Sequence, residues 1–550
     1  MMKPSVLGTA TVLVCACLAR GFADERPLSD SPTLRELPGD GDTAAEESKP
    51  PSAFLHVDDQ RFFDAEGRQV LLHGMNVISK SKDEGYLSWH RAEDFAKMRA
   101  WGMNCIRLGI IWDGIEPEPG KYDEAYLDGV AKRVAWAAEH GLFVFLDMHQ
   151  DLFSVLYGDG VPAWATLHEN RPHRQGGVWS DAYLLSPAVQ TSFDNFWANA
   201  PAADGVGIQD RYAAAWRHVA NRFAKEPTVI GYDLMNEPFQ GTSILAAQIV
   251  LLSGRFGTRL GELLGKSVGS PAQIAELWKQ PEGRAVIMKH LDDMGLYGDF
   301  LDAQTGISQA FERRRLQGMH QRVAHAIREV DSQHVLLLEP SYACNVGVCS
   351  AIESVVGPDG SRDARQAYAP HAYDIVVDTP AMANANPQRI VMIFDRHRKT
   401  AERLKMPLII GEWGAFGAAD ERILDSARVL QRELEKRLCG DTYWEYEADI
   451  ENRAYFGVLK RSIPSRIAGV LLEYSSHPET GGFACRWRES PEITAPTILY
   501  LTEASFKNRT VRLEPPGSGF EVSPASDTSG DVYLFVRPTG RSVERSLTSQ

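Results

Sequence analysis

Two glutamates, each at the end of a short apolar run, are the residues best placed to do chemistry in this sequence. Glu237 stands in Asn236-Glu237-Pro238, and Glu412 stands in Gly411-Glu412-Trp413-Gly414. A carboxylate at the end of a buried strand is costly unless it is paired or hydrogen-bonded. Taken alone, either glutamate is explained as a structural carboxylate at a strand end. Two at matching positions favour a catalytic pair.

Two opposed carboxyl groups are what the cleavage of a glycosidic bond requires. One carries a proton and delivers it to the leaving oxygen, while the other stays ionised and attacks the anomeric carbon or activates a water molecule. Burial and like charge push the pKa values of the two groups apart, so identical side chains take different roles. A separation of about 5–5.5 Å retains the sugar's configuration, and a wider gap that admits water inverts it.

The elements that must position these glutamates alternate between strand and helix patterns. Helical periodicity is predicted between several apolar runs, at 92–100, 126–140, 212–224, 311–330 and 421–437. The β-rich runs themselves are predicted at 69–76, 104–108, 142–149, 229–236, 334–339, 367–373, 408–413 and 442–447. Eight strands with interposed helices predict an α/β fold, a (β/α)8 TIM barrel, although an open doubly wound sheet has the same periodicity. A barrel keeps its reactive groups at the carboxyl ends of its strands.

Composition divides the chain into four segments. Residues 1–23 are typical of a signal peptide, with Lys3, a short apolar run and a small-x-small cleavage site, so we expect a secreted protein and leave membrane association open. Residues 24–53 are polar and predict a disordered linker. Residues 54–460 are assigned to the barrel, and 461–550 to a small β-sandwich domain with a frayed tail.

Two connections between the predicted strands are unusually long, at about 150–208 and about 239–306. Loops after barrel strands build the active-site face, so both insertions are expected to shape a site. The second insertion contains the apolar run 244–252, followed by Phe256 and Leu260. One interpretation is a helical hairpin packed on the barrel. The other is a partly exposed apolar surface for a lipid or amphiphile.

The charge balance and the motif search exclude several function classes. With 58 Lys+Arg against 73 Asp+Glu, the formal charge is −15, which argues against a nucleic-acid partner. Gly-x-Gly patterns lack the context of a dinucleotide site. The sequence also lacks a Gly-x-Ser-x-Gly elbow and a His-Glu-x-x-His zinc motif. We therefore expect no metal and no organic cofactor, and the oligomeric state stays open.

Six stretches together resemble clan A glycoside hydrolases of family 5, and among them the endoglycoceramidases, over most of residues 54–460. They are Leu72-His73-Gly74-Met75-Asn76, Asn104-Cys105-Ile106-Arg107-Leu108-Gly109, Asp147-Met148-His149-Gln150-Asp151, Asn236-Glu237-Pro238, Pro370-His371-Ala372-Tyr373-Asp374 and Gly411-Glu412-Trp413-Gly414. The His-Gln-Asp after the third strand and the β-rich tail favour that branch over cellulases. The resemblance implies a retaining enzyme that cleaves the β-bond between oligosaccharide and ceramide in glycosphingolipids, with transient contact to a membrane or micelle surface.

The resemblance also implies roles for individual residues. Glu237 would be the acid/base, Glu412 the nucleophile, and Arg107 the support that keeps Glu412 ionised. Tyr373 would donate to Glu412, and Trp444 would offer a flat face to a sugar ring. The full set of implied substrate-binding residues is Lys80, Asp147, His149, Asn236, His371, Tyr373 and Trp444. Each role has a structural alternative. His149 and His371 would be core histidines, Trp444 would pack in the barrel, and Arg107 would form an ion pair with any barrel carboxylate.

Three other functions stay open at this point. One is a β-glucosidase or β-galactosidase that acts on simple glycosylceramides or steryl glucosides. Another is an endo-β-glucanase. The third is a carbohydrate- or lipid-binding protein with an inactive barrel, which is the reading that the presence of both glutamates disfavours.

Overall fold

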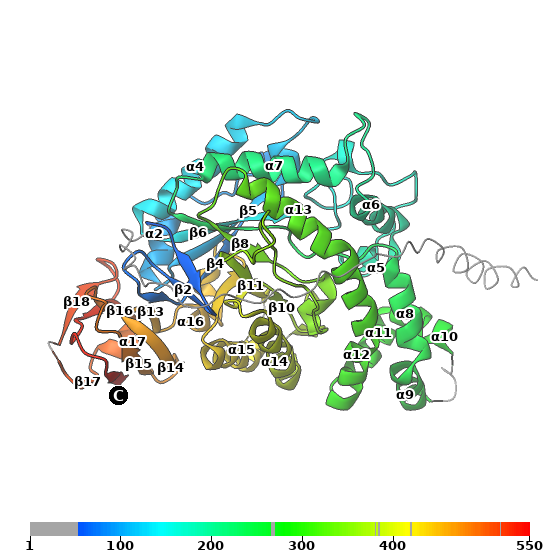
Figure 1. Cartoon of the computed structure of the whole chain (residues 1–550). Helices are drawn as coiled ribbons and strands as arrows, with labels where there is room; N and C mark the ends of the chain where they lie inside the picture. Colours follow the sequence, from blue (N-terminus) through cyan, green and yellow to red (C-terminus); the bar gives the residue numbers. More distant parts are fainter. Residues whose placement is uncertain (1–52, 266–269, 380, 383–384, 418–420, 518) are drawn as a thin grey trace, which may run out of the picture. The chain divides into compact units, whose positions relative to one another are not determined.

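The structure, a computed structural model, describes residues 53–550 apart from 266–269, 380, 383–384, 418–420 and 518 (Figure 1). The expected signal peptide (1–23) and residues 24–52 of the expected linker lie outside the described residues. Among the described helices, none combines the length and the apolarity that crossing a bilayer requires.

A parallel sheet that curls into a barrel forms the centre of the fold. Its strand order in the described residues is β10-β11-β12-β4-β5-β6-β7-β8-β9, and a parallel bridge from Tyr368 in β9 to Leu408, just before β11, joins its two edges. Nearly every residue of these strands is buried, as expected for strands covered on both faces. The strands are β4 (His73–Val77), β5 (Cys105–Ile111), β6 (Phe143–His149), β7 (Val229–Asp233), β8 (Val335–Leu338), β9 (Gln366–Tyr368), β10 (His371–Ala372), β11 (Ile409–Gly414) and β12 (Gly440–Trp444). The predicted TIM barrel is confirmed.

Helices cover the outside of this barrel with their apolar stripes. On α7, for example, Tyr212, Trp216 and Val219 are buried one turn apart, and Asp123 caps the start of α4 by accepting from the backbone N–H of Tyr126. The long outer helices are α2 (Ala92–Ala100), α4 (Glu124–Glu139), α7 (Ile208–Phe223), α13 (Gln317–Arg328), α14 (Pro387–Leu404) and α15 (Leu424–Arg437). Short turns complete the barrel region: η1 (Lys82–Glu84), α3 (Trp112–Ile115), η4 (Tyr342–Val346), η6 (Glu421–Ile423), η7 (Ile450–Asn452) and α16 (Phe456–Leu459).

Both long connections fold into helices. The first carries η2 (Ala163–Ala165), α5 (Asp181–Leu185) and α6 (Pro187–Trp197). The second carries α8 (Ser243–Ser253), α9 (Arg255–Leu264), α10 (Pro271–Trp278), α11 (Pro281–His290) and α12 (Met294–Phe311), which the π-helical segment η3 (Glu312–Leu316) joins to α13. Figure 1 shows α8 to α12 grouped beside the barrel strands, and a separate apolar core that includes Phe256, Leu260 and Leu301 holds them together. The insertion is therefore a small helical layer, which is more than a hairpin.

Two antiparallel sheets share one apolar core after the barrel and form the β-sandwich. The seven-stranded sheet has the order β1-β2-β3-β13-β16-β19-β18, with β1 (His56–Asp58), β2 (Arg61–Phe63), β3 (Gln69–Val70), β13 (Ile463–Ile467), β16 (Thr497–Leu501), β18 (Phe520–Pro524) and β19 (Val532–Val536). The four-stranded sheet has the order β14-β15-β20-β17, with β14 (Gly469–His477), β15 (Gly482–Glu489), β17 (Val511–Glu514) and β20 (Glu544–Ser549); the short helix α17 (Glu503–Phe506) follows β16.

The start of the chain pairs with the strands of this sandwich, while its apolar side chains Leu55, Phe62 and Val70 share a core cluster with barrel-strand residues. Val70 pairs with Arg466, so residues 56–70, which the sequence interpretation assigned to the barrel, extend the C-terminal sheet. The single run predicted at 69–76 is split in two, because β3 ends at Val70 and β4 begins at His73. The polar end of the chain is also more ordered than predicted, since β20 runs to Ser549.

Candidate active site

The two glutamates meet at the carboxyl end of the barrel. Glu237 follows β7 and Glu412 lies in β11, and both are almost fully buried, with exposed fractions of 6% and 4%. One oxygen of each carboxyl group and a ring nitrogen of His371 all lie within 4.8 Å of one another. A pair this close matches the retaining geometry and leaves too little room for the water that an inverting pair of about 6.5–9.5 Å admits.

Glu412 receives hydrogen bonds on both of its oxygens. Arg107 donates from Nη1 to Oε1 at 2.5 Å, and the Tyr373 hydroxyl donates to Oε2 at 2.8 Å. Bonds from a charged donor to a carboxylate are short and strong. The two hydrogen bonds that the resemblance implies for Glu412 are therefore present, and they hold its carboxyl group in position.

Glu237 lies in a different environment, which favours its protonated form. Burial raises the pKa of Glu237 to about 7, and the negative charges of Glu412 and Asp151 add to this, while His371 opposes it. His371 approaches Oε1 of Glu237 with Nδ1 at 2.9 Å, and Asn345 donates to the same oxygen at 2.6 Å. The carboxyl group of Glu237 can thus hold a proton near neutral pH beside that of Glu412.

The backbone of Glu237 has an uncommon conformation. Its φ of +44° lies in the left-handed region, which non-glycine residues rarely adopt. The N–H of Glu237 donates to Oε2 of Glu339 at 2.8 Å, and this bond helps to fix the turn.

Arg107 joins the buried groups under the site. Its guanidinium donates to Asp233 at 2.9 Å, to Glu339 at 2.8 Å and to the side-chain oxygen of Asn236 at 2.9 Å, and it pairs with Asp147 at 3.0 Å. Burial opposes the charge on Arg107, but these carboxylates outweigh burial and raise its pKa. Arg107 therefore positions several site residues at once, which goes beyond the predicted support of Glu412.

Lys80, His149 and Trp444, to which the resemblance gives substrate contacts, line one side of the site. The His149 ring stacks on Trp444 with centroids 5.2 Å apart and an interplanar angle of 12°, and the Lys80 ammonium lies 4.5 Å from the centroid of a Trp444 ring. Lys80 also pairs with Asp151. Asn236, Tyr373, Glu237 and Glu412 complete the polar side of the same cavity.

Two predicted substrate-binding residues do not line the cavity. Asp147 is enclosed between His149 Nδ1, at 2.8 Å, and Arg107, so it orients other site residues and is out of reach of a ligand. Burial opposes the charge on His149, but Asp147 outweighs burial and raises the pKa of His149 to about 10. His371 is likewise fully buried; the carboxylates of Glu339 and Glu412 overcome the effect of burial and raise its pKa. Its ring nitrogens contact Glu237 at 2.9 Å, Glu339 at 3.2 Å and Glu412 at 3.4 Å.

Sequence reasoning missed Glu339 and Asn345. Glu339 ends a predicted strand, as Glu237 and Glu412 do, so the same strand-end signal could have found it. Asn345 lies in η4, in a loop without regular periodicity, and no signal in the sequence points to it.

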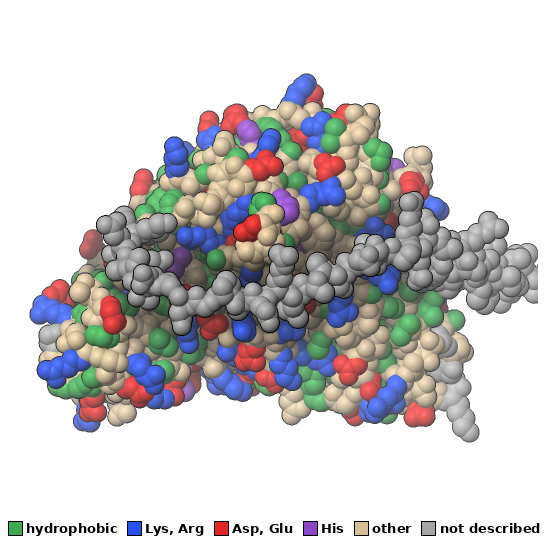
Figure 2. Space-filling model, viewed as in Figure 1, with side chains coloured by type: hydrophobic (Ala, Val, Ile, Leu, Met, Phe, Trp, Pro, Cys, Tyr) green, Lys and Arg blue, Asp and Glu red, His purple; other side chains and the backbone are tan. Residues whose placement is uncertain are grey.

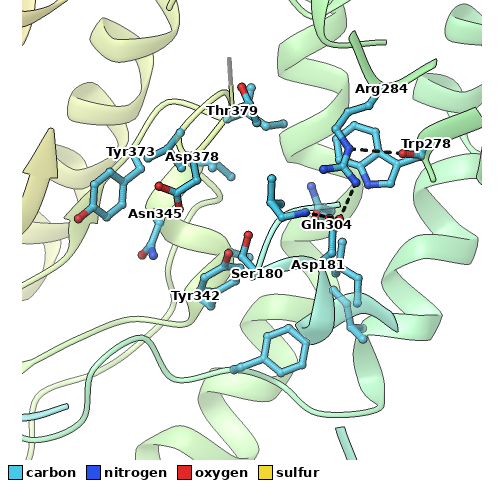
Figure 3. A pocket seen from close by; sticks show the side chains of 18 of the residues that line it. Ser180, Asp181, Trp278, Arg284, Gln304, Tyr342, Asn345, Tyr373, Asp378 and Thr379 are labelled. Carbon is cyan, nitrogen blue, oxygen red and sulfur yellow. Dashed lines mark hydrogen bonds and ion pairs between the residues drawn. The ribbon is translucent and has the colours of Figure 1, made fainter. Parts of the chain in front are cut away.

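A cavity of about 430 Å³ is lined by the two glutamates and extends toward the helical layer. Figure 3 shows Tyr373 and Asn345 on one side of it and Trp278 and Arg284 on the other. Its far walls are apolar, with Leu184, Phe239, Ile244, Leu251, Leu252, Ile274, Trp278, Ile287, Met288 and Phe300 among the lining residues. Arg284 of α11 pairs with Asp181 of α5 at 2.7 Å at the edge of these walls, and so ties the two insertions together. The cavity is polar at the glutamates and apolar beyond them.

Three trios of buried groups come close enough to bind a cation: His149 with Asp151 and Asp159, Glu237 with His371 and Glu412, and Asp147 with Asp233 and Glu339. Cationic side chains already contact the acids of each trio. Lys80 pairs with Asp151, and Arg107 pairs with Glu412 and with all three acids of the last trio. The donor sets thus resemble ion-pair networks more than metal sites.

Comparison with known proteins agrees with this geometry. The chain matches the cellulase family, glycosyl hydrolase family 5, over residues 63–449. It is 33% identical over 216 residues to an endoglycoceramidase of Cyanea nozakii, a match that covers 34% of this chain and 42% of that protein. It is 34% identical over 201 residues to endoglycoceramidase I of Rhodococcus hoagii (strain 103S), covering 36% and 39%. The chain thus spans about two fifths of the length of these curated relatives.

A solved structure is similar over a longer stretch. Endo-glycoceramidase II from Rhodococcus sp. superposes with a TM-score of 0.67 at 27% identity, covering 90% of this chain and 99% of that one. The family match, the barrel and the paired carboxyl groups all indicate a glycosyl hydrolase. The chain belongs to glycosyl hydrolase family 5.

Proposed function

We propose that this glycoside hydrolase is a retaining endo-glycosidase that cleaves the β-bond between an oligosaccharide and ceramide. The observation that carries the proposal is the continuity of one cavity, which joins the two glutamates to an apolar chamber between the helical insertions. A polysaccharide has no alkyl chains that such a chamber could bury. A glycolipid does, because every CH₂ kept from water contributes about 0.8 kcal/mol.

In the proposed reaction the two glutamates act in sequence. Glu412 attacks the anomeric carbon while Glu237 gives its proton to the leaving oxygen, and a glycosyl-enzyme ester forms on Glu412. Glu237, now a carboxylate, takes a proton from water, and the hydroxide attacks the ester to release the sugar with its configuration retained. In this scheme Trp444 and His149 face the sugar, and Asn236 contacts a sugar hydroxyl.

The relatives support both the substrate and the covalent step. Structures of endo-glycoceramidase II from Rhodococcus sp. include a ganglioside GM3 complex and a lactosyl-enzyme intermediate. We extend the substrate class and the intermediate to this chain because its cavity combines the paired carboxyl groups with an apolar chamber.

The outer face of the helical layer supports transient contact with a lipid surface. Leu245, Ile249 and Val250 of α8 are each about half exposed, while Ile244 and Leu252 of the same helix line the cavity. Figure 2 shows green hydrophobic side chains among charged ones in the region where Figure 1 places α8 and α9. A helix that lines the chamber and also exposes apolar side chains is suited to accept a lipid from a membrane or micelle. The signal-like residues 1–23 support export to where such lipids are met.

Mass analysis of products from a glycolipid panel tests the proposed function. The wild type should release intact oligosaccharide and free ceramide from a ganglioside, and Glu412→Gln and Glu237→Gln should each lose nearly all turnover. Glu282→Gln, a change on the exposed surface of α11, serves as the matched control and should keep full activity. Release of a single sugar from simple glycosylceramides only, or of fragments from β-glucan, would identify one of the rival enzymes; binding without turnover would contradict the enzyme assignment.

A further inference from the structure

Asn345 makes a contact that the two-glutamate scheme does not explain. Its side-chain N–H donates to Oε1 of Glu237 at 2.6 Å, and His371 Nδ1 lies 2.9 Å from the same oxygen. Within the described part of the chain, hydrogen bonds reach the carboxyl group of Glu237 at Oε1 and not at Oε2. Glu237 lines the cavity, so Oε2 is the oxygen left to face a ligand.

An oxygen that accepts from two N–H groups is a poor place for a proton. An amide N–H is always a donor, and His371 is held in its charged form by Glu339 and Glu412, so it donates as well. A proton on Oε1 would lose at least one of these bonds. A proton on Oε2 keeps both.

We propose that Asn345 is a further positioning residue, which directs the proton of Glu237 to Oε2 and tunes the strength of that acid. The inference rests on the proposed role of Glu237. As a Glu412 oxygen bonds to the anomeric carbon, the bond from that carbon to the leaving oxygen breaks and its electron pair goes to the oxygen. The Oε2 proton moves to the leaving oxygen, and Glu237 becomes a carboxylate. Asn345 and His371 then stabilise the new charge through Oε1.

Hydrogen bonds to Glu312 and Gln309 hold the loop that carries Asn345. The buried carboxylate of Glu312 accepts from the N–H of Ser341 and the hydroxyl of Ser350, both at 3.0 Å, and from the N–H of Ala351. Gln309 of α12 donates to the carbonyl of Cys349 at 3.1 Å. Tyr342 and Val346, the near neighbours of Asn345, line the cavity on the chamber side. Asn345 therefore lies on the leaving-group side of Glu237 in a fixed loop.

The direction of the expected effect follows from the groups that face Glu237. The charged neighbours are His371, Glu412 and Asp151, and the phenols of Tyr183, Tyr342 and Tyr373 also lie close. Asn345 is a neutral donor among them. Since a donor to the carboxylate favours its ionised form, removing it raises the pKa of Glu237 and weakens the acid.

A series of aryl and alkyl β-glycosides tests this role in the full chain. Asn345→Ala should lower kcat/KM about 10- to 100-fold for alkyl leaving groups, the effect expected for a lost hydrogen bond to a charged group. It should change the value for a 2,4-dinitrophenyl leaving group, which needs no proton, by less than about threefold. The fall of kcat/KM at high pH should move to higher pH. Asn345→Asp, which keeps the shape of the side chain, should move it further, because it adds a like charge.

Gln309→Ala is the matched control, because it removes an amide that holds the same loop without touching Glu237. It should lower the melting temperature while leaving the pH profile and the dependence on the leaving group unchanged. Equal losses with every leaving group and an unmoved pH profile in both Asn345 variants would overturn the inference. If the wild type hydrolyses aryl glycosides but no glycolipid, the proposed substrate is wrong, and the Asn345 variants still test the role of Asn345. If the wild type hydrolyses no glycoside, both the proposed function and the role of Asn345 are wrong.

Discussion

Replacing Leu252 of α8 with alanine should weaken the recognition of long alkyl chains, whereas the same change at Leu245 should not. Leu252 lines the apolar chamber, while Leu245 lies on the same helix, is 46% exposed and does not line the cavity. Because the two substitutions remove the same atoms from one helix, they change its intrinsic propensity to a similar extent. The difference in kcat/KM between the two variants therefore measures the contribution of the chamber wall to binding of the alkyl chain.

The size of the effect follows from the atoms removed. Leucine to alanine deletes three carbons, worth about 2.4 kcal/mol at about 0.8 kcal/mol each. Leu252 is already half-buried in the free protein. A bound chain therefore gains about half of that figure, roughly 1.2 kcal/mol, which corresponds to about an eightfold loss of kcat/KM.

Alkyl β-lactosides of increasing chain length, each below its micelle concentration, provide the assay. For Leu252→Ala the loss should grow with chain length and vanish for the shortest chain, and Leu245→Ala should match the wild type throughout. An equal loss at every chain length, or an equal loss in the two variants, would refute the assignment of the chamber to the lipid part.

Three further predictions concern the polar end of the site. Because Glu237 must be protonated to act and its pKa is raised to about 7, kcat/KM for ceramide substrates should fall as pH rises through about 7; a pH profile that stays flat to pH 9 would contradict this. Tyr373→Phe removes a 2.8 Å donor to Glu412 and should lower kcat about 10- to 100-fold with the fold intact by circular dichroism, and an unchanged kcat would rule out that role. Arg107→Met leaves several buried carboxylates unpaired and should lower the free energy of unfolding by about 3–5 kcal/mol in a denaturant titration, whereas a loss of activity at unchanged stability would show that Arg107 does not hold the cluster together.

The barrel and its reactive pair could be predicted because their signals are local. Apolar runs such as 142–149 and 229–236 predict buried parallel strands, and a glutamate at the end of a strand must lie on the face where all strand ends meet. What the sequence could not show depends on contacts between distant segments. Residues 69–70 pair with β13, about 400 positions later, and no local pattern distinguishes a barrel strand from a sandwich strand.

The same limit explains why two buried residues were predicted to contact the substrate although they do not line the cavity. Asp147 and His371 belong to strand ends, as the sequence indicates, but only the fold shows that other site residues enclose them. Asn345 enters the site from a loop that Glu312 holds in place, and that anchor comes from a different helix. A pattern in the sequence predicts which face a residue occupies and leaves its depth in the site undetermined.

A slow covalent substrate offers the most direct test that Glu412 is the nucleophile. Incubation with an activated 2-deoxy-2-fluoro β-glycoside, followed by mass analysis of the intact protein and of its peptides, should show one added sugar on the peptide that contains Glu412. Glu412→Gln should show none. A label on another residue, or a wild type that stays unlabelled while it hydrolyses the parent glycoside with inversion, would contradict the account.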